Sequence, residues 1–124
     1  MGQQQLLLII LGTIVVGVAI VVGIRMFADS SAEMNIDMTT GELVHHAWDA
    51  QSYYRQPEAM AGGGKTFLGW ALSDSSDNAV YSADVSAQTV TLTGTCRTAE
   101  RSDGSPVTIV VTVGPMTMST QVNR

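Results

Sequence analysis

Residues 6–24 read LLLIILGTIVVGVAIVVGI, and this stretch decides the fold. It contains no charged residue, and fourteen of its 19 residues are Leu, Ile or Val. As a helix rising about 1.5 Å per residue it would span roughly 28 Å, close to the ~30 Å hydrocarbon core of a bilayer. Each Leu, Ile or Val near the middle favours insertion by about 0.3–0.6 kcal/mol, and no charge opposes the sum. We therefore predict a membrane-inserted helix.

A cleaved signal peptide is the less favoured interpretation of the same stretch. The apolar run is longer than the usual ~7–15 residues of such peptides, and no basic residue precedes it. Arg25, Met26 and Phe27 follow it and offer no small-x-small cleavage site. We expect the helix to be retained.

Small residues fall four apart twice inside the run, Thr13 with Gly17 and Ala19 with Gly23. Such pairs let the backbones of two helices approach closely where lipid provides no hydrophobic drive for association. We therefore expect this helix to pack against copies of itself through Leu6, where the apolar run begins, and through these four small residues.

The helical pattern continues beyond the apolar run as a narrower stripe. Its members recur at spacings of four and three, as on one face of an amphipathic helix: Ala32, Ile36, Thr39, Leu43, Ala47, Ala50 and Tyr54. Pro57 and the glycines at 62–64 end it. Ser30 with Glu33 and Thr39 with Glu42 match the capping box that starts helices, which leaves a kink or unwound stretch near 28–31 or 39–41 open.

The C-terminal half alternates apolar residues with threonine, the period of a sheet that is buried on one face. Strands are predicted at 78–86, 88–96, 107–113 and 116–122, with a weaker one at 67–72. Residues 103–106 supply a turn, and Gly114-Pro115 is either a turn or a kink. The fold class is α+β: a long N-terminal hydrophobic helix on an antiparallel sheet of about four strands, with segments 1–27 and 28–124.

The charges and the single cysteine exclude several functions. The net charge is -5, and the six basic residues are scattered, so a nucleic-acid reader is not expected. Cys96 stands alone, which rules out a disulfide within the chain, and its strand position predicts a small buried hydrophobe.

No motif for catalysis, a cofactor or a metal is found. Residues 62–66, GGGKT, lack the earlier glycine of a phosphate loop, because Ala59 stands there. His45 and His46 are adjacent, so in a helix they point about 100° apart and do not easily share one ion. We predict that the protein is not an enzyme and holds no cofactor or metal.

Aromatic and methionine side chains are interpreted as packing groups. We expect Trp48, Tyr53, Tyr54 and Trp70 to close the junction between helix and sheet. Met34 and Met38 lie one helical turn apart, and Met116 and Met118 are expected to share a strand face. Packing explains both pairs.

Gly2, the apolar helix from Leu6, its amphipathic extension and the small sheet together resemble type IV pilins and the related pseudopilins. The resemblance implies a membrane-anchored precursor, cleavage by a prepilin peptidase between Gly2 and Gln3, and helices that then bundle in a filament core. The chain departs from the family in four ways. Only Met1 precedes Gly2, where the family usually has basic residues, and Gln3 stands where an aromatic residue is usual. Leu7 stands where the family usually has glutamate, and no C-terminal disulfide is possible with Cys96 alone.

The function expected from this resemblance is a structural subunit of a cell-surface filament. Its partners would be copies of itself, the membrane before assembly, the prepilin peptidase and the assembly machinery. The alternative is a single-span membrane-anchored domain that binds a partner in the periplasm or outside the cell, because the same hydropathy allows it.

Overall fold

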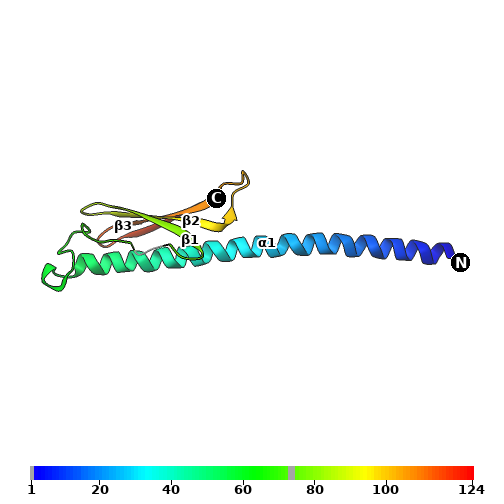
Figure 1. Cartoon of the computed structure of the whole chain (residues 1–124), viewed down its shortest axis with the longest axis horizontal. Helices are drawn as coiled ribbons and strands as arrows, with labels where there is room; N and C mark the ends of the chain where they lie inside the picture. The colour runs from blue at the N-terminus through cyan, green and yellow to red at the C-terminus, as the bar shows by residue number, and fades with distance from the viewer. Residues whose placement is uncertain (1, 73–74) are drawn as a thin grey trace. The chain divides into compact units, whose positions relative to one another are not determined.

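The computed structural model describes residues 2–72 and 75–124. Helix α1 (Gly2–Arg55) is followed by a short 3-10 turn, η1 (Glu58–Met60). The strands are β1 (Ala79–Val85), β2 (Val90–Glu100), β3 (Pro106–Val113) and β4 (Met118–Asn123). They form one antiparallel sheet in the order β1-β2-β3-β4, which confirms the predicted α+β class with its four strands (Figure 1).

Contacts divide the chain into two compact units, Met1–Ser31 and Ala32–Arg124. The first, unit 1, contains the apolar part of α1 (from Gly2). The second, unit 2, contains the rest of α1 and the whole sheet. The sequence placed a boundary four residues earlier, between 27 and 28, where the composition changes.

The backbone of α1 is helical at both places where the sequence left a kink or unwound stretch open. The hydroxyl of Thr39 donates to the carbonyl oxygen of Asn35 at 2.7 Å, and that of Thr40 to the carbonyl of Ile36 at 2.8 Å. A threonine that bonds back to the preceding turn continues a helix and does not cap a new one. The capping-box patterns therefore lie inside the helix.

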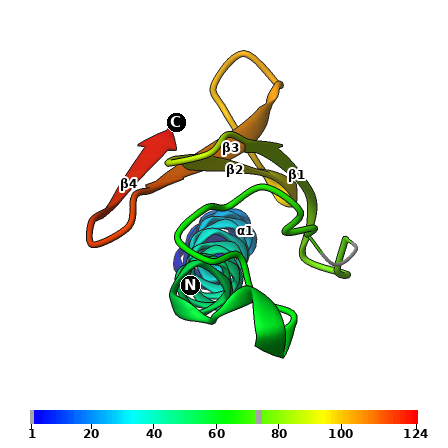
Figure 2. The ribbon, with the colours of Figure 1, turned by 90° about the vertical axis from the view of Figure 1, so that its left-hand side faces the viewer.

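The core of unit 2 lies between one face of α1 and one face of the sheet. Figure 2 shows the sheet curving over the helix. The predicted helix stripe is confirmed: Ile36, Leu43 and Ala47 are buried, with Ala32 and Tyr54 half-buried at its ends. The predicted alternation is confirmed on both central strands. The buried residues are Val90, Leu92 and Cys96 in β2, and Val107, Ile109, Val111 and Val113 in β3. Fully burying each such side chain contributes about 1.5–3 kcal/mol.

Gly94 in β2 sets how closely the helix approaches the sheet. A Cβ atom added there would stand 3.0 Å from Leu43 Cδ1 and 3.0 Å from Thr39 Cγ2. A side chain at this position would press against α1, so glycine allows the helix to lie close to the strand.

The turn predicted at 103–106 is present, and the alternative left open at Gly114-Pro115 is resolved as a turn. Between β2 and β3, the Arg101 N–H donates to the Ser105 carbonyl at 2.7 Å, and Gly104 adopts a φ of 86°. Between β3 and β4, the Gly114 N–H donates to the Thr117 carbonyl at 2.8 Å, so Gly114-Pro115 begins a hairpin turn and not a kink.

The weak strand predicted at 67–72 is wrong. The Phe67 N–H donates to the Ala87 carbonyl, and the Phe67 carbonyl accepts a bond from the Trp70 N–H, which closes a turn and not a strand ladder. Gly69 has a φ of 92°, which interrupts an extended path. Phe67 is nevertheless fully buried, and its ring packs on Tyr54 with centroids 4.8 Å apart.

Several side chains that were expected to pack within the chain are exposed. Trp48 is 64% exposed and does not take part in the helix–sheet junction, which Tyr53, Tyr54 and Trp70 do line. Met34 and Met38 are exposed on α1. Met116 lies in the β3–β4 turn at 86% exposure and does not share a buried face with Met118.

Cys96 is buried, as predicted. Its Sγ lies 3.7 Å from the Thr39 hydroxyl oxygen, and burial raises the pKa of the thiol. A thiol held protonated in this way packs as a small apolar group.

Candidate functional site

Unit 1 presents apolar side chains on every side of a helix. Residues 2–30 are all exposed within the chain, and they include the whole run of Leu, Ile and Val from residue 6 to residue 24. In the part of the chain that the structure describes, α1 is the one helix long and apolar enough to cross a membrane, judged by length and composition. A membrane anchor and an N-terminal signal sequence both have these properties.

The two predicted small-residue pairs lie on different faces of this helix. At about 100° per residue, Thr13 and Gly17 are separated by roughly 40° around the axis, as are Ala19 and Gly23, but the two pairs are roughly 120° apart. A Cβ atom added at Gly17 or Gly23 would meet no atom within 4 Å, so each glycine leaves an open notch. The small residues of the apolar run therefore lie on two separate faces of the helix.

Sequence reasoning missed Gly12, which belongs to the second face. It precedes Ala19 by seven residues and Gly23 by eleven, and both spacings return to nearly the same direction around a helix. A Cβ atom there also meets nothing within 4 Å. Gly12 forms no small-xxx-small pair with Ala19 or Gly23, so a pattern of small residues four apart does not include it.

Thr13, the polar residue of the run, is satisfied within the helix. Its hydroxyl donates to the Ile9 carbonyl oxygen at 2.8 Å. A hydroxyl bonded in this way can enter an apolar surrounding without leaving an unpaired donor. Leu6 is exposed like its neighbours, and the possible processing residues Gly2 and Gln3 are exposed and lie in the first turn of α1.

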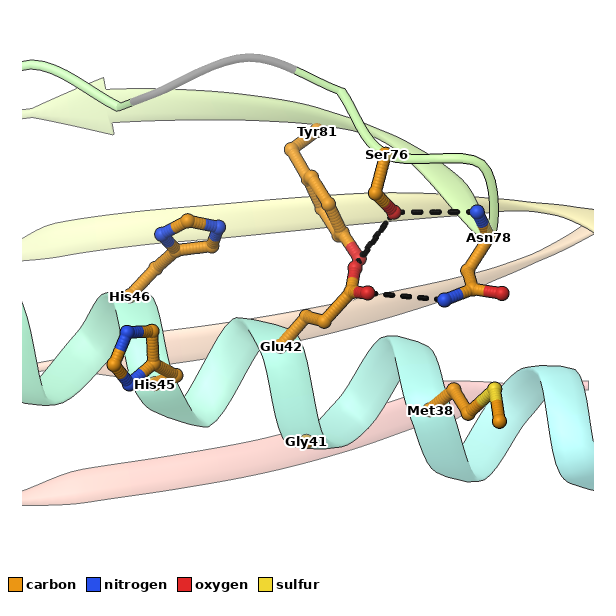
Figure 3. A pocket seen from close by; sticks show the side chains of 8 residues that line it. All are labelled: Met38, Gly41, Glu42, His45, His46, Ser76, Asn78 and Tyr81. Atoms are coloured by element: carbon orange, nitrogen blue, oxygen red, sulfur yellow. Dashed lines mark hydrogen bonds between the residues drawn. The ribbon is translucent and has the colours of Figure 1, made fainter.

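A hollow of unit 2 lies between α1 and the start of β1, with a volume of about 640 Å³ (Figure 3). Its centre is the carboxylate of Glu42. Ser76 Oγ donates to one oxygen at 2.7 Å, Asn78 Nδ2 donates to the other at 2.9 Å, and the Tyr81 hydroxyl also donates to Glu42. The carboxylate thus ties the helix to the segment that enters β1.

The charge state of this group follows from its surroundings. Burial disfavours the ionised form of Glu42, but hydrogen bonds from Tyr81, Ser76 and Asn78, with His46 nearby, outweigh it and lower its pKa. Burial, and next the bond to Glu42, raises the pKa of Tyr81 to about 12. At neutral pH the carboxylate is ionised and the phenol is protonated. A general base needs a pKa near the working pH, whereas the pKa of Glu42 is lowered, so Glu42 is best described as a structural acceptor.

The two histidines border the same hollow. Their ring centroids are 6.1 Å apart, and the ring of His46 meets Tyr81 edge to face at 5.5 Å. Among residues 2–72 and 75–124, no group of three or more His, Cys, Asp or Glu is placed to hold a metal ion. The hollow is therefore lined by a hydrogen-bonded carboxylate and two imidazoles, and these described side chains are not grouped so as to hold a metal ion.

Comparison with known proteins gives no match: no protein family, no curated protein and no solved structure is similar to this chain. The exposed apolar helix of unit 1 is its strongest candidate site, and the Glu42 hollow is a structural feature of unit 2.

Proposed function

We propose that this chain is the structural subunit of an extracellular, type IV pilin-like filament, and that it polymerises through residues 6–24. The observation that carries the proposal is the exposure of the apolar side chains all around unit 1. Such a surface is stable only in lipid or against other apolar helices. A bundle of identical helices satisfies it outside the membrane.

The small residues support the same proposal. Gly12, Gly17 and Gly23 leave open notches on two faces, so each helix can meet more than one neighbour. A filament core needs contacts on several sides of each helix, whereas a pair of helices needs one.

The surface of the sheet supports an exposed head. Thr91, Thr93 and Thr95 in β2 alternate with buried residues and remain partly exposed, as does Thr108 in β3. A threonine-rich outer face is suited to solvent. We propose a cell-surface location for this head, with the chain held in the membrane by α1 before assembly.

The alternative is a membrane-anchored domain that binds a partner and stays single. Such a protein normally has a flexible linker between its membrane helix and its domain. Here α1 is assigned as helix without interruption from Gly2 to Arg55, across the boundary at Ser31 and Ala32. The absence of a coil segment within this helix favours the filament.

We also propose that the chain is not an enzyme. The best-connected carboxylate of the described residues, Glu42, accepts three hydrogen bonds, and its lowered pKa makes it a weak base at neutral pH.

Mechanical shearing followed by fractionation tests the proposed function. Cells that produce the chain are sheared, and the released material and the washed membranes are each assayed for it by mass spectrometry. We expect the assembled chain in the released, sedimentable fraction and the rest in membranes. Exclusive recovery from detergent-extracted membranes would instead favour the anchored interaction domain.

A further inference from the structure

A second hollow, of about 440 Å³, lies at the end of unit 2 where α1 finishes. It is lined by Tyr54, Arg55, Lys65, Pro115 and Met116. Two sets of bonds fix its walls. Gln51 Nε2 donates to the carbonyls of Gly114 and Thr117 at 3.3 and 3.2 Å, and the Lys65 N–H donates to the Tyr54 carbonyl at 3.0 Å.

This hollow concentrates positive charge in an acidic protein. Arg55 and Lys65 are two of only six basic residues in a chain of net charge -5. Over the described residues the one ion pair joins Arg124 to Glu33 at 2.7 Å, so neither Arg55 nor Lys65 is paired within the chain there. Met116, almost fully exposed, adds an apolar rim. The occupant that fits is a compact segment carrying a carboxylate.

The turn between β2 and β3 is such a segment. Both the N–H and the hydroxyl of Ser105 donate to one oxygen of Asp103, at 2.9 and 2.6 Å, and these bonds lower the pKa of the carboxyl. Arg101, the nearest cation in the turn, is directed back into the sheet, where it donates to the Asn123 carbonyl at 3.1 Å and to Thr108 Oγ1 at 3.0 Å. Asp103 is exposed, ionised and held in a fixed orientation.

The two features lie at opposite ends of the same strand. β3 begins after the Asp103 turn and ends before the turn that carries Pro115 and Met116, as Figure 1 shows for the two ends of the sheet. A contact between opposite ends of identical molecules is heterologous, so it repeats without closing on itself. Such a contact builds a row of heads.

We propose that heads of neighbouring copies bind head to tail, with the Asp103 turn of one copy seated in the Arg55–Lys65 hollow of the next. This inference rests on the proposed function, and adds to it a polar contact between heads. The charges of the two surfaces are complementary, and Met116 excludes water around them. Charge pairs of this kind mainly determine which surfaces meet and in which register.

The test reverses each charge in the full-length chain. Lys65→Glu and Asp103→Lys should each lower the yield of sheared filaments about tenfold, because each places like charges together. The double variant Lys65→Glu/Asp103→Lys should restore it. Asp84→Lys, which reverses an exposed charge elsewhere in the sheet, serves as the matched control.

A second readout uses disulfide cross-linking. Cells that produce Lys65→Cys together with Asp103→Cys should yield a ladder of cross-linked multimers on mild oxidation, since the native Cys96 is buried. Filaments that form equally well with either single reversal, with no ladder, would overturn the head-to-tail contact alone and leave the helix-driven filament standing. If the single variants fail and the double variant is not rescued, the hollow binds another acidic partner and the inference is wrong. A wild-type chain that never forms filaments removes the proposed function itself.

Discussion

The side-chain oxygen of Asn35 in α1 accepts a hydrogen bond from the backbone N–H of Ala99 in β2 at 3.2 Å. It also accepts one from Thr98 at 3.3 Å, and its Nδ2 donates to the Asn78 carbonyl at 2.9 Å. The pairing of β2 with β3 shifts between Thr95 and Glu100, which leaves these N–H groups without strand partners. A helix side chain therefore satisfies the irregular part of the sheet.

Replacing Asn35 by alanine should destabilise unit 2. The buried N–H of Ala99 would lose its acceptor, which costs about 1–3 kcal/mol. Thermal unfolding of the full chain in detergent, followed by circular dichroism, should show a midpoint lower by roughly 4–8 °C for each kcal/mol. Met34→Ala, on the exposed side of the same turn, is the control. Equal midpoints for the two variants would show that Asn35 is dispensable.

Replacing Gly94 and replacing Gly41 should change the stability of unit 2 in opposite directions. Gly94→Val places a side chain within 3.0 Å of Leu43 and Thr39 and should cost about 1–3 kcal/mol by overpacking. Gly41→Ala adds a methyl group that meets nothing within 4 Å on α1 and should stabilise by about 0.5–1 kcal/mol. Urea unfolding in detergent measures both. The close approach of helix to sheet is refuted if Gly94→Val matches the wild type.

Glu42 predicts a loss of stability in acid. Its pKa is lowered from an ordinary 4.5 on folding, so the unfolded state binds the proton more readily. The stabilisation is fully present above pH 4.5 and is lost as the pH falls through the lower folded value. Glu42→Gln should be less stable than the wild type at neutral pH and should show a shallower decline below pH 4.5. An unchanged acid slope in the variant would assign that slope to other carboxyl groups.

Replacing Gly17 should separate membrane insertion of the helix from assembly of the filament. Gly17→Leu keeps the run apolar, so insertion should remain, but it fills the notch through which a neighbouring helix approaches. We expect membrane-bound chain at the wild-type level and filament yield at least tenfold lower. Val18→Leu, about 100° away around the helix, is the matched control. Normal filaments from Gly17→Leu would exclude close packing at Gly17.

The elements with a clear period could be predicted from the sequence. The stripe through Ile36 and Leu43 recurs at three and four residues, and the alternation of β3 recurs at two, so each pattern identified its element and its buried face. These faces meet because neither can be buried alone.

The rest depends on contacts that no local period records. Asn35 is only 7% exposed, but an asparagine on a helix looks like a surface residue until the strand irregularity that it satisfies is known. Phe67 is buried from an irregular loop that lacks any repeat. An aromatic residue such as Trp48 is expected to pack, yet it occupies the exposed side of its helix. Met116 continues the alternation of the last strand in the sequence, but β4 begins only at Met118 and leaves Met116 in the turn.

Electron microscopy of material sheared from the cell surface tests the central proposal most directly. Purified filaments should contain this chain as the dominant protein by mass spectrometry, and their core should be a bundle of helices in which residues 6–24 of neighbouring copies are in contact. The same density would show whether Met1 and Gly2 are still attached. Filaments that lack this chain, with the chain found only in detergent-extracted membranes, would contradict the proposal.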